Sequence, residues 1–217
     1  MNLIGVVNPK NVVGEALLKS FSDLPGAEAF AMTVNSFDIE DFEDLIRTKL
    51  KEDNIFIFNS KFTDELKEVD INYADRVCAE LGDLFRAIKK LTNLLLREGK
   101  KGKFIFITTN PSISHSSSFP ISPIYDGAVH SLVRSLAKEF KSTQLIFHGV
   151  CIEPVCEMIN ESELRDYQRR MKVYAMRKRP IRLEALADFI KNVALTNLGL
   201  SSGSIFYIGE GLDQLNF

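Results

Sequence analysis

Short runs of large apolar residues, separated by longer amphipathic stretches, are the feature that most constrains the fold. The runs at 55–59 (IFIFN) and 104–108 (FIFIT) are almost continuously apolar. Runs this short and this apolar are typical of strands covered on both faces. Further strands are predicted at 3–7, 28–34, 145–152 and 205–208.

The stretches between these runs carry apolar residues at steps of three and four, which indicates amphipathic helices. The longest is 73–97, with Val77, Leu81, Leu84 and Ile88 on one stripe. Strands that alternate with helices predict a parallel sheet covered on both faces. We therefore expect one α/β domain over 1–217, a Rossmann-like doubly wound parallel sheet of about six strands. Helices are predicted at 14–21, 39–52, 73–97, 125–140 and 183–198.

Composition narrows the class of protein. The chain has 217 residues, 45% of them hydrophobic, which is enough for one well-buried core. A net charge of −2 gives no field that would attract nucleic acid. The three cysteines and three histidines lack metal-ligand spacing, so neither zinc nor a disulfide framework is predicted. Without an apolar run of membrane length or a signal-peptide pattern, we expect a soluble, cytoplasmic protein.

The segment from 103 to 140 carries the clearest chemical pattern. A strand ends in hydroxyl residues, Tyr125 opens the next helix, and the sequence SLAKEF follows. This arrangement resembles the catalytic segment of the short-chain dehydrogenase/reductase family. The resemblance implies that Tyr125 transfers a proton and that Ser112 or Thr109 holds the substrate oxygen. In that family a lysine one turn after the tyrosine lowers its pKa, but here that position is Val129.

The expected dinucleotide turn, 7–15, is also altered. The family's glycine pattern falls on Val7, Asn8, Val12 and Gly14, so only the last glycine is kept. The missing glycines would allow the backbone to approach a pyrophosphate, and a valine at position 12 would fill that space. Asn59 falls where the family has an asparagine after its apolar strand. The degenerate cofactor residues are therefore Asn8, Val12, Gly14 and Asn59.

The resemblance covers nearly the whole chain, but one strand–helix unit that normally reads the adenosine ribose is missing. We expect no cofactor, and NAD(P) only if the altered site still works. By resemblance, 155–182 is a lid-like insertion. Its basic stretch at 169–179 either docks an acidic partner such as an acyl carrier protein or forms a solvated face. Helices 73–97 and 125–140 are expected to pair with a second subunit.

Two functions of different class follow from this pattern. One is a non-catalytic relative, a pseudoenzyme subunit that pairs with itself or with an active ketoacyl-type reductase. The alternative is an NAD(P)-dependent carbonyl reductase with a rearranged site built on Tyr125 and Ser112 or Thr109. A third, weaker hypothesis is a small-molecule sensor that uses the same pocket.

Overall fold

The computed structural model describes residues 2–33, 42–59, 72–110, 123–153, 155–159, 161, 164–165, 168–169 and 180–209. Within these residues the predicted architecture is confirmed: six parallel strands form one sheet in the order β2-β1-β3-β4-β5-β6. The strands are β1 (Asn2–Val7), β2 (Ala27–Met32), β3 (Asp53–Asn59), β4 (Lys101–Thr109), β5 (Leu145–Ile152) and β6 (Ile205–Ile208).

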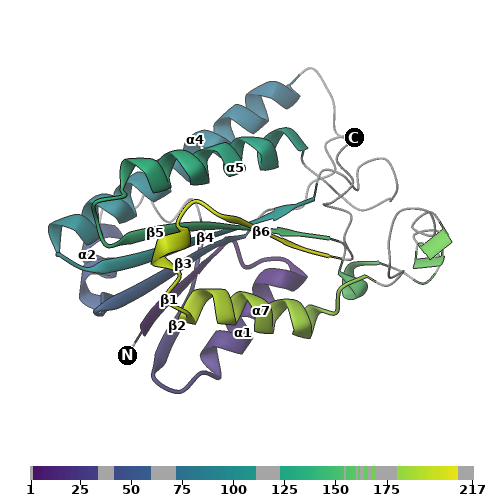
Figure 1. The fold of residues 1–217 in the computed structure, drawn as a ribbon, viewed down its shortest axis with the longest axis horizontal. Coiled ribbons are helices and arrows are strands. Elements are labelled where there is room, and N and C mark those ends of the chain that lie inside the picture. Colours follow the sequence, from purple (N-terminus) through teal and green to yellow (C-terminus); the bar gives the residue numbers. More distant parts are fainter. Residues whose placement is uncertain are drawn as a thin grey trace.

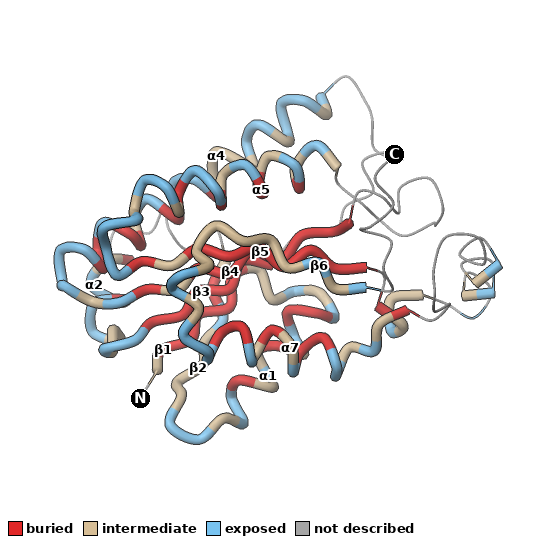
Figure 2. Tube along the Cα trace, in the orientation of Figure 1, coloured by how far each residue is buried: buried red, intermediate tan, exposed pale blue. Residues whose placement is uncertain are grey.

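Helices cover both faces of this sheet (Figure 1). Helices α1 (Val12–Ser22) and α7 (Leu183–Leu195) lie on one face. Helices α2 (Phe42–Lys49), α4 (Tyr73–Arg97) and α5 (Pro123–Glu139) lie on the other. Figure 2 shows the consequence for burial, because the central strands are buried while the outward sides of α4 and α5 are exposed.

The two faces of the sheet have different chemistry. Successive side chains of a strand point to opposite faces, so the runs IFIFN and FIFIT divide into two layers. Phe56, Phe58, Phe104 and Phe106 face α4 and α5, and their rings pack at centroid distances such as 5.0 Å for Phe58 and Phe106. The neighbouring isoleucines face α1 and α7. An aromatic layer therefore supports α4 and α5, and an aliphatic layer supports α1 and α7.

The chain order creates a switch point between β1 and β3. From β1 the chain crosses to β2 at one edge, and it then returns to β3 on the other side of β1. The two strands end level with each other, since Val7 is in register with Phe58. In open parallel sheets, the crevice beyond the strand ends at such a point is the usual place for a ligand.

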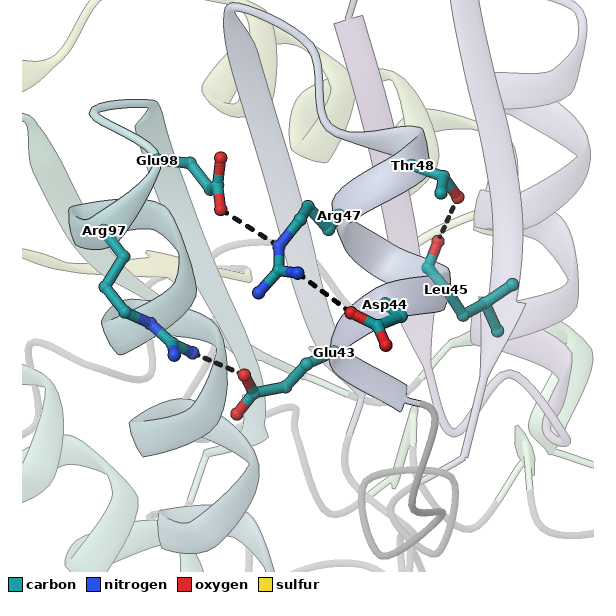
Figure 3. Close-up of polar contacts among 7 residues, drawn as sticks. All are labelled: Glu43, Asp44, Leu45, Arg47, Thr48, Arg97 and Glu98. Atoms are coloured by element: carbon teal, nitrogen blue, oxygen red, sulfur yellow. Dashed lines mark hydrogen bonds and ion pairs between the residues drawn. The ribbon is translucent and has the colours of Figure 1, made fainter.

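Helix α2 is attached to α4 by a small apolar contact with ion pairs around it (Figure 3). Arg47 contacts Glu98 at 3.0 Å, and Arg97 contacts Glu43. These pairs are exposed, so each contributes at most about 1 kcal/mol. Buried Phe42 and Ile46 hold the helix in place.

Several boundaries differ from the predicted ones for identifiable reasons. Helix α7 ends at Leu195 rather than at 198, because the Lys103 ammonium of β4 donates hydrogen bonds to the carbonyls of Val193, Ala194 and Thr196. A cation is favourable at the C-terminal end of a helix. Helix α5 begins at Pro123, which suits the first helical position, so Tyr125 lies in the first turn. Helix α2 ends at Lys49 rather than at 52, and 39–41 of the predicted helix lie outside the described residues.

The ends of the expected lid are close together. Val155 bridges to Ile181, and the Leu183 N–H donates to the Glu157 carboxylate at 3.0 Å. Most of the interior of 155–182 lies outside the described residues, so the lid stays a prediction. The same holds for the basic stretch 169–179, of which only Arg169 is described. No helix in the described part of the chain is long and apolar enough to cross a membrane.

Candidate functional site

A cavity of about 420 Å³ opens at the switch point, beyond the carboxyl ends of β1, β3 and β4. Its volume is within the range of small-molecule sites. The β1–α1 turn forms one wall and helices α4 and α5 form the other, above Phe58 and Phe106. Four of the residues singled out from the sequence, Asn8, Asn59, Tyr125 and Val129, line this cavity.

An amide network occupies the β1–α1 turn. The side chain of Asn11 caps helix α1, and its Oδ1 accepts a hydrogen bond of 2.9 Å from the Gly14 N–H. The Asn59 Nδ2 group donates to the same oxygen at 2.6 Å and to the Asn8 carbonyl at 3.2 Å. Asn8 has a positive φ of 57°, a conformation that asparagine tolerates better than most residues. An N–H group at the N-terminal end of α1 therefore has its hydrogen-bond acceptor within the chain itself.

This network changes the interpretation of the predicted cofactor residues. The N–H groups at a helix N-terminus normally attract phosphate, but at Gly14 the acceptor is the Asn11 oxygen. Val12 is 39% exposed and does not line the cavity, so the expectation that it fills the phosphate space stays a prediction. Asn11, one residue earlier, is the residue that caps the helix, and the sequence reasoning missed it.

Close packing explains why position 14 is a glycine. A Cβ atom at this position would lie 2.6 Å from the Pro9 Cα and 2.8 Å from the Asn59 Nδ2. Real Cβ atoms do not approach other atoms so closely. The glycine is therefore required by the contact between helix α1 and its own entry turn, with no phosphate involved.

Tyr125 lies in an acidic environment. Burial is the largest cause that raises the pKa of its hydroxyl above the usual value, and the charges of Glu80 and Asp126 raise it further. Val129, one turn later, is 2% exposed and supplies no charge. Among the described lining residues Lys10 is the only cation, and it is exposed. Burial and these two charges thus all disfavour the phenolate form of Tyr125.

Of the two candidate hydroxyl residues, Thr109 at the end of β4 contacts helix α5, and Ser112 is not described. Both the N–H and the hydroxyl of Thr109 donate to Asp126 Oδ2, the N–H at 3.0 Å. Asp126 is 1% exposed. Its burial could not be predicted from the sequence, because an aspartate in a first helical turn usually faces water. Ser112 lies outside the described residues.

His130 does not replace the missing lysine. Its Nε2 atom is 2.7 Å from the Thr108 hydroxyl, and the ring is buried. Burial lowers the pKa of His130, and the nearby charge of Arg134 lowers it further, so the neutral ring is favoured. The described residues also contain no group of three or more His, Cys, Asp or Glu side chains that could hold a metal ion.

The role of Gly14 can be tested by adding one methyl group. Gly14→Ala should reduce the free energy of unfolding by about 1–3 kcal/mol, because the new Cβ overlaps the Pro9 backbone. Gly127→Ala is the matched control, since a Cβ there has no neighbour within 4 Å. In this exposed helical position it should be neutral or stabilise by up to about 1 kcal/mol. Urea unfolding measures both, and equal effects at the two sites would contradict the packing explanation.

No protein-family model matches the chain, and no curated protein matches its sequence significantly. Several solved structures, in contrast, match the fold of the chain. A 4-hydroxyisoleucine dehydrogenase complexed with NADH superposes with a TM-score of 0.76 at 15% identity, over 99% of each chain. A short-chain dehydrogenase family protein from Francisella tularensis has a TM-score of 0.74 at 13% identity, again over 99% of each chain. A variant actinorhodin polyketide ketoreductase with NADPH has a TM-score of 0.74 at 14% identity, over 100% of this chain and 98% of that one. The chain therefore has the fold of the short-chain dehydrogenases and ketoreductases.

Proposed function

We propose that this chain is a non-catalytic subunit built on the short-chain dehydrogenase fold, which acts by association with a second subunit. The observation that carries the proposal is the environment of Tyr125. A tyrosine that must exchange a proton near neutral pH needs a cation beside it. Here Val129 takes the place of that cation, and Glu80 and Asp126 add negative charge.

We also propose that the chain has no bound dinucleotide cofactor. Two of the similar solved structures contain NADH or NADPH. In this chain the Asn11 side chain caps the N-terminal end of α1, and Asn59 binds the same oxygen. A pyrophosphate at this helix end would have to displace these hydrogen bonds. NAD(P) is the cofactor only under the alternative below.

The alternative is an NAD(P)-dependent carbonyl reductase with a rearranged site. It is favoured by the cavity itself, which reaches Tyr125 and has a volume suited to a small molecule. Under this alternative Tyr125 is the acid, and Ser112 or Thr109 holds the substrate oxygen. The engagement of Thr109 with Asp126 leaves Ser112 as the stronger of the two candidates.

The outward face of α4 supports association with another subunit. An exposed stripe with steps of three and four runs along this helix and contains Phe85, which is 51% exposed, and Leu96, which is 42% exposed. Such a stripe is typical of helices that pack against a partner helix. Helix α5 lies beside α4 and presents small exposed residues, Gly127 and Ser131.

Charge on this stripe favours an antiparallel pairing of α4 with α4. Asp75 lies seven residues before Gly82, and Lys89 lies seven residues after it. Seven residues are close to two turns, so all three lie on one side of the helix. A two-fold axis at Gly82 sets Asp75 of one copy beside Lys89 of the other, twice per dimer. The proposed partner is a second copy or a related active reductase of the ketoacyl type.

Docking of an acyl carrier protein at 169–179 and a cytoplasmic location stay predictions.

Catalysis is tested with NADPH and a panel of ketones. The purified chain should oxidise NADPH no faster than a blank, and Tyr125→Phe should behave in the same way. The same variant should change the free energy of unfolding by less than about 1.5 kcal/mol, since only a hydroxyl is removed. Turnover that disappears in Tyr125→Phe would establish the alternative.

Association is tested by a charge exchange followed by sedimentation velocity. The wild-type chain should sediment at twice its 24.5 kDa mass. Lys89→Glu and Asp75→Lys should each weaken the dimer by about tenfold, because each disrupts two pairs. The double variant should recover most of the loss. Lys19→Glu, on the opposite face of the sheet, is the control and should leave the dimer unchanged. Additive losses in the double variant would contradict the proposed pairing.

A further inference from the structure

A second cavity lies at the amino ends of the strands, opposite to the switch point. It has a volume of about 860 Å³ and is bounded by the first residues of β3, β4 and β5 and by the α5–β5 and α7–β6 connections. This volume is within the range of small-molecule sites. The two cavities share no described lining residue. A role of the second cavity is therefore independent of the proposed function.

Three lysines give this cavity a positive wall. Lys101, Lys103 and Lys141 line it, and Asp53 is the only carboxylate among its described lining residues. The Asp53 Oδ1 atom lies 3.9 Å from the Lys101 Nζ atom, which is too far for a direct hydrogen bond. The chain as a whole has a net charge of −2, so this wall is a local excess of positive charge. Such a wall attracts an anion.

Two of the three lysines are accessible to a ligand. The Lys103 ammonium donates to three carbonyls at the C-terminal end of α7, so it holds that helix end. The side chain of Lys101 is 50% exposed. Lys141 is also exposed, and its ammonium has no partner in the part of the chain that the structure describes. A carboxylate can form charge-assisted hydrogen bonds with such groups.

Two exposed leucines form another part of the lining. Leu195, at the end of α7, is 40% exposed, and Leu200, on the short helix Gly199–Ser201, is fully exposed. Single exposed leucines are common on protein surfaces, but these two share one cavity with the lysines. The cavity thus combines cations with exposed apolar side chains.

We propose that this cavity binds a small amphiphilic carboxylate, a free molecule with one carboxylate and a short alkyl chain. The carboxylate pairs with Lys101 and Lys141, and the alkyl chain covers Leu195 and Leu200. Opposite charge selects the carboxylate, and the removal of leucine surface from water favours the alkyl chain. A concave site of this size admits a free molecule, whereas a bilayer presents a flat surface, so the ligand is not a membrane.

Calorimetry with three probes tests the two parts of the ligand. Octanoate has both parts, octanol keeps the chain without the charge, and acetate keeps the charge without the chain. We expect octanoate to bind at least about tenfold more tightly than either of the others. Equal affinity for octanoate and octanol, or for octanoate and acetate, would overturn the proposal, and so would the absence of octanoate binding at millimolar concentration. Binding of phosphatidylglycerol vesicles without binding of free octanoate would indicate a lipid surface instead and would also overturn it.

A lysine variant tests the site of the carboxylate. Lys141→Gln removes one exposed cation, so the preference for octanoate over octanol should fall about threefold. Lys19→Gln removes the same charge from α1, outside this cavity, and should leave the preference unchanged. Equal losses in the two variants would indicate binding elsewhere and overturn the proposal.

A leucine variant tests the site of the alkyl chain. Leu200→Ser should weaken the binding of octanoate and octanol equally, by about fivefold, because the chain no longer covers a leucine. Leu45→Ser removes an exposed leucine from α2, outside this cavity, and should leave both affinities unchanged. Unchanged binding in Leu200→Ser would overturn the proposal. Circular dichroism of all the variants establishes that the fold is retained.

Amide chemical shifts in NMR spectra locate the bound probe. Octanoate should shift the amide signals of Gly102 and Gly199, which line this cavity, and leave that of Gly14, beside the switch point, unchanged. A shift of the Gly14 signal without shifts at the other two would mean that octanoate binds at the switch point, and would overturn the proposal.

Discussion

The stacked phenylalanine layer between the sheet and helices α4 and α5 is the interaction on which the rest of the molecule depends. Phe104 stacks on Phe147 at 4.9 Å, and Phe58 stacks on Phe106 at 5.0 Å. Each ring contributes roughly 1.5–3 kcal/mol through burial and sets the height at which the two helices lie. Two of these rings, Phe58 and Phe106, form the floor of the cavity, and α5 holds Tyr125 above it. Stability and the geometry of the site therefore have a common origin.

The β1–α1 turn lies at the position that the fold uses for ligands, but the N-terminal end of its helix has a hydrogen-bond acceptor from the chain itself. The strands still end at a switch point, and the helix still begins beside it. What differs is the acceptor at the helix N-terminus, which is the Asn11 side chain, supported by Asn59. An internal acceptor stabilises the turn without a ligand. Such a turn does not need a cofactor in order to fold. This is consistent with the proposed subunit that works by association.

Most of the fold could be predicted from the sequence because its determinants are local. The helix Tyr73–Arg97 and the strands Leu145–Ile152 and Ile205–Ile208 have the boundaries predicted from apolar spacing. The end of α7 could not be predicted, because it depends on Lys103 from a distant strand. The fold class followed from the alternation of elements, and the solved structures agree with it.

The site was less predictable because its key contacts join residues far apart in sequence. Motif comparison identified the loss of the lysine at Val129 and the presence of Tyr125. It did not identify Asn11 as the capping residue, nor the pairs Thr109–Asp126 and Thr108–His130, which depend on how α5 lies against β4. Asparagine at a helix start is a capping signal, so Asn11 was accessible from the sequence. The two pairs between β4 and α5 could not be predicted in this way.

We propose that the amide network of the β1–α1 turn leaves no site for a dinucleotide. Calorimetric titration of the purified chain with NADH and then NADPH tests it most directly. We expect no binding heat for either nucleotide up to millimolar concentrations. Micromolar binding of either one would mean that the Asn11 cap yields to a pyrophosphate, and the chain would then have to be treated as an enzyme.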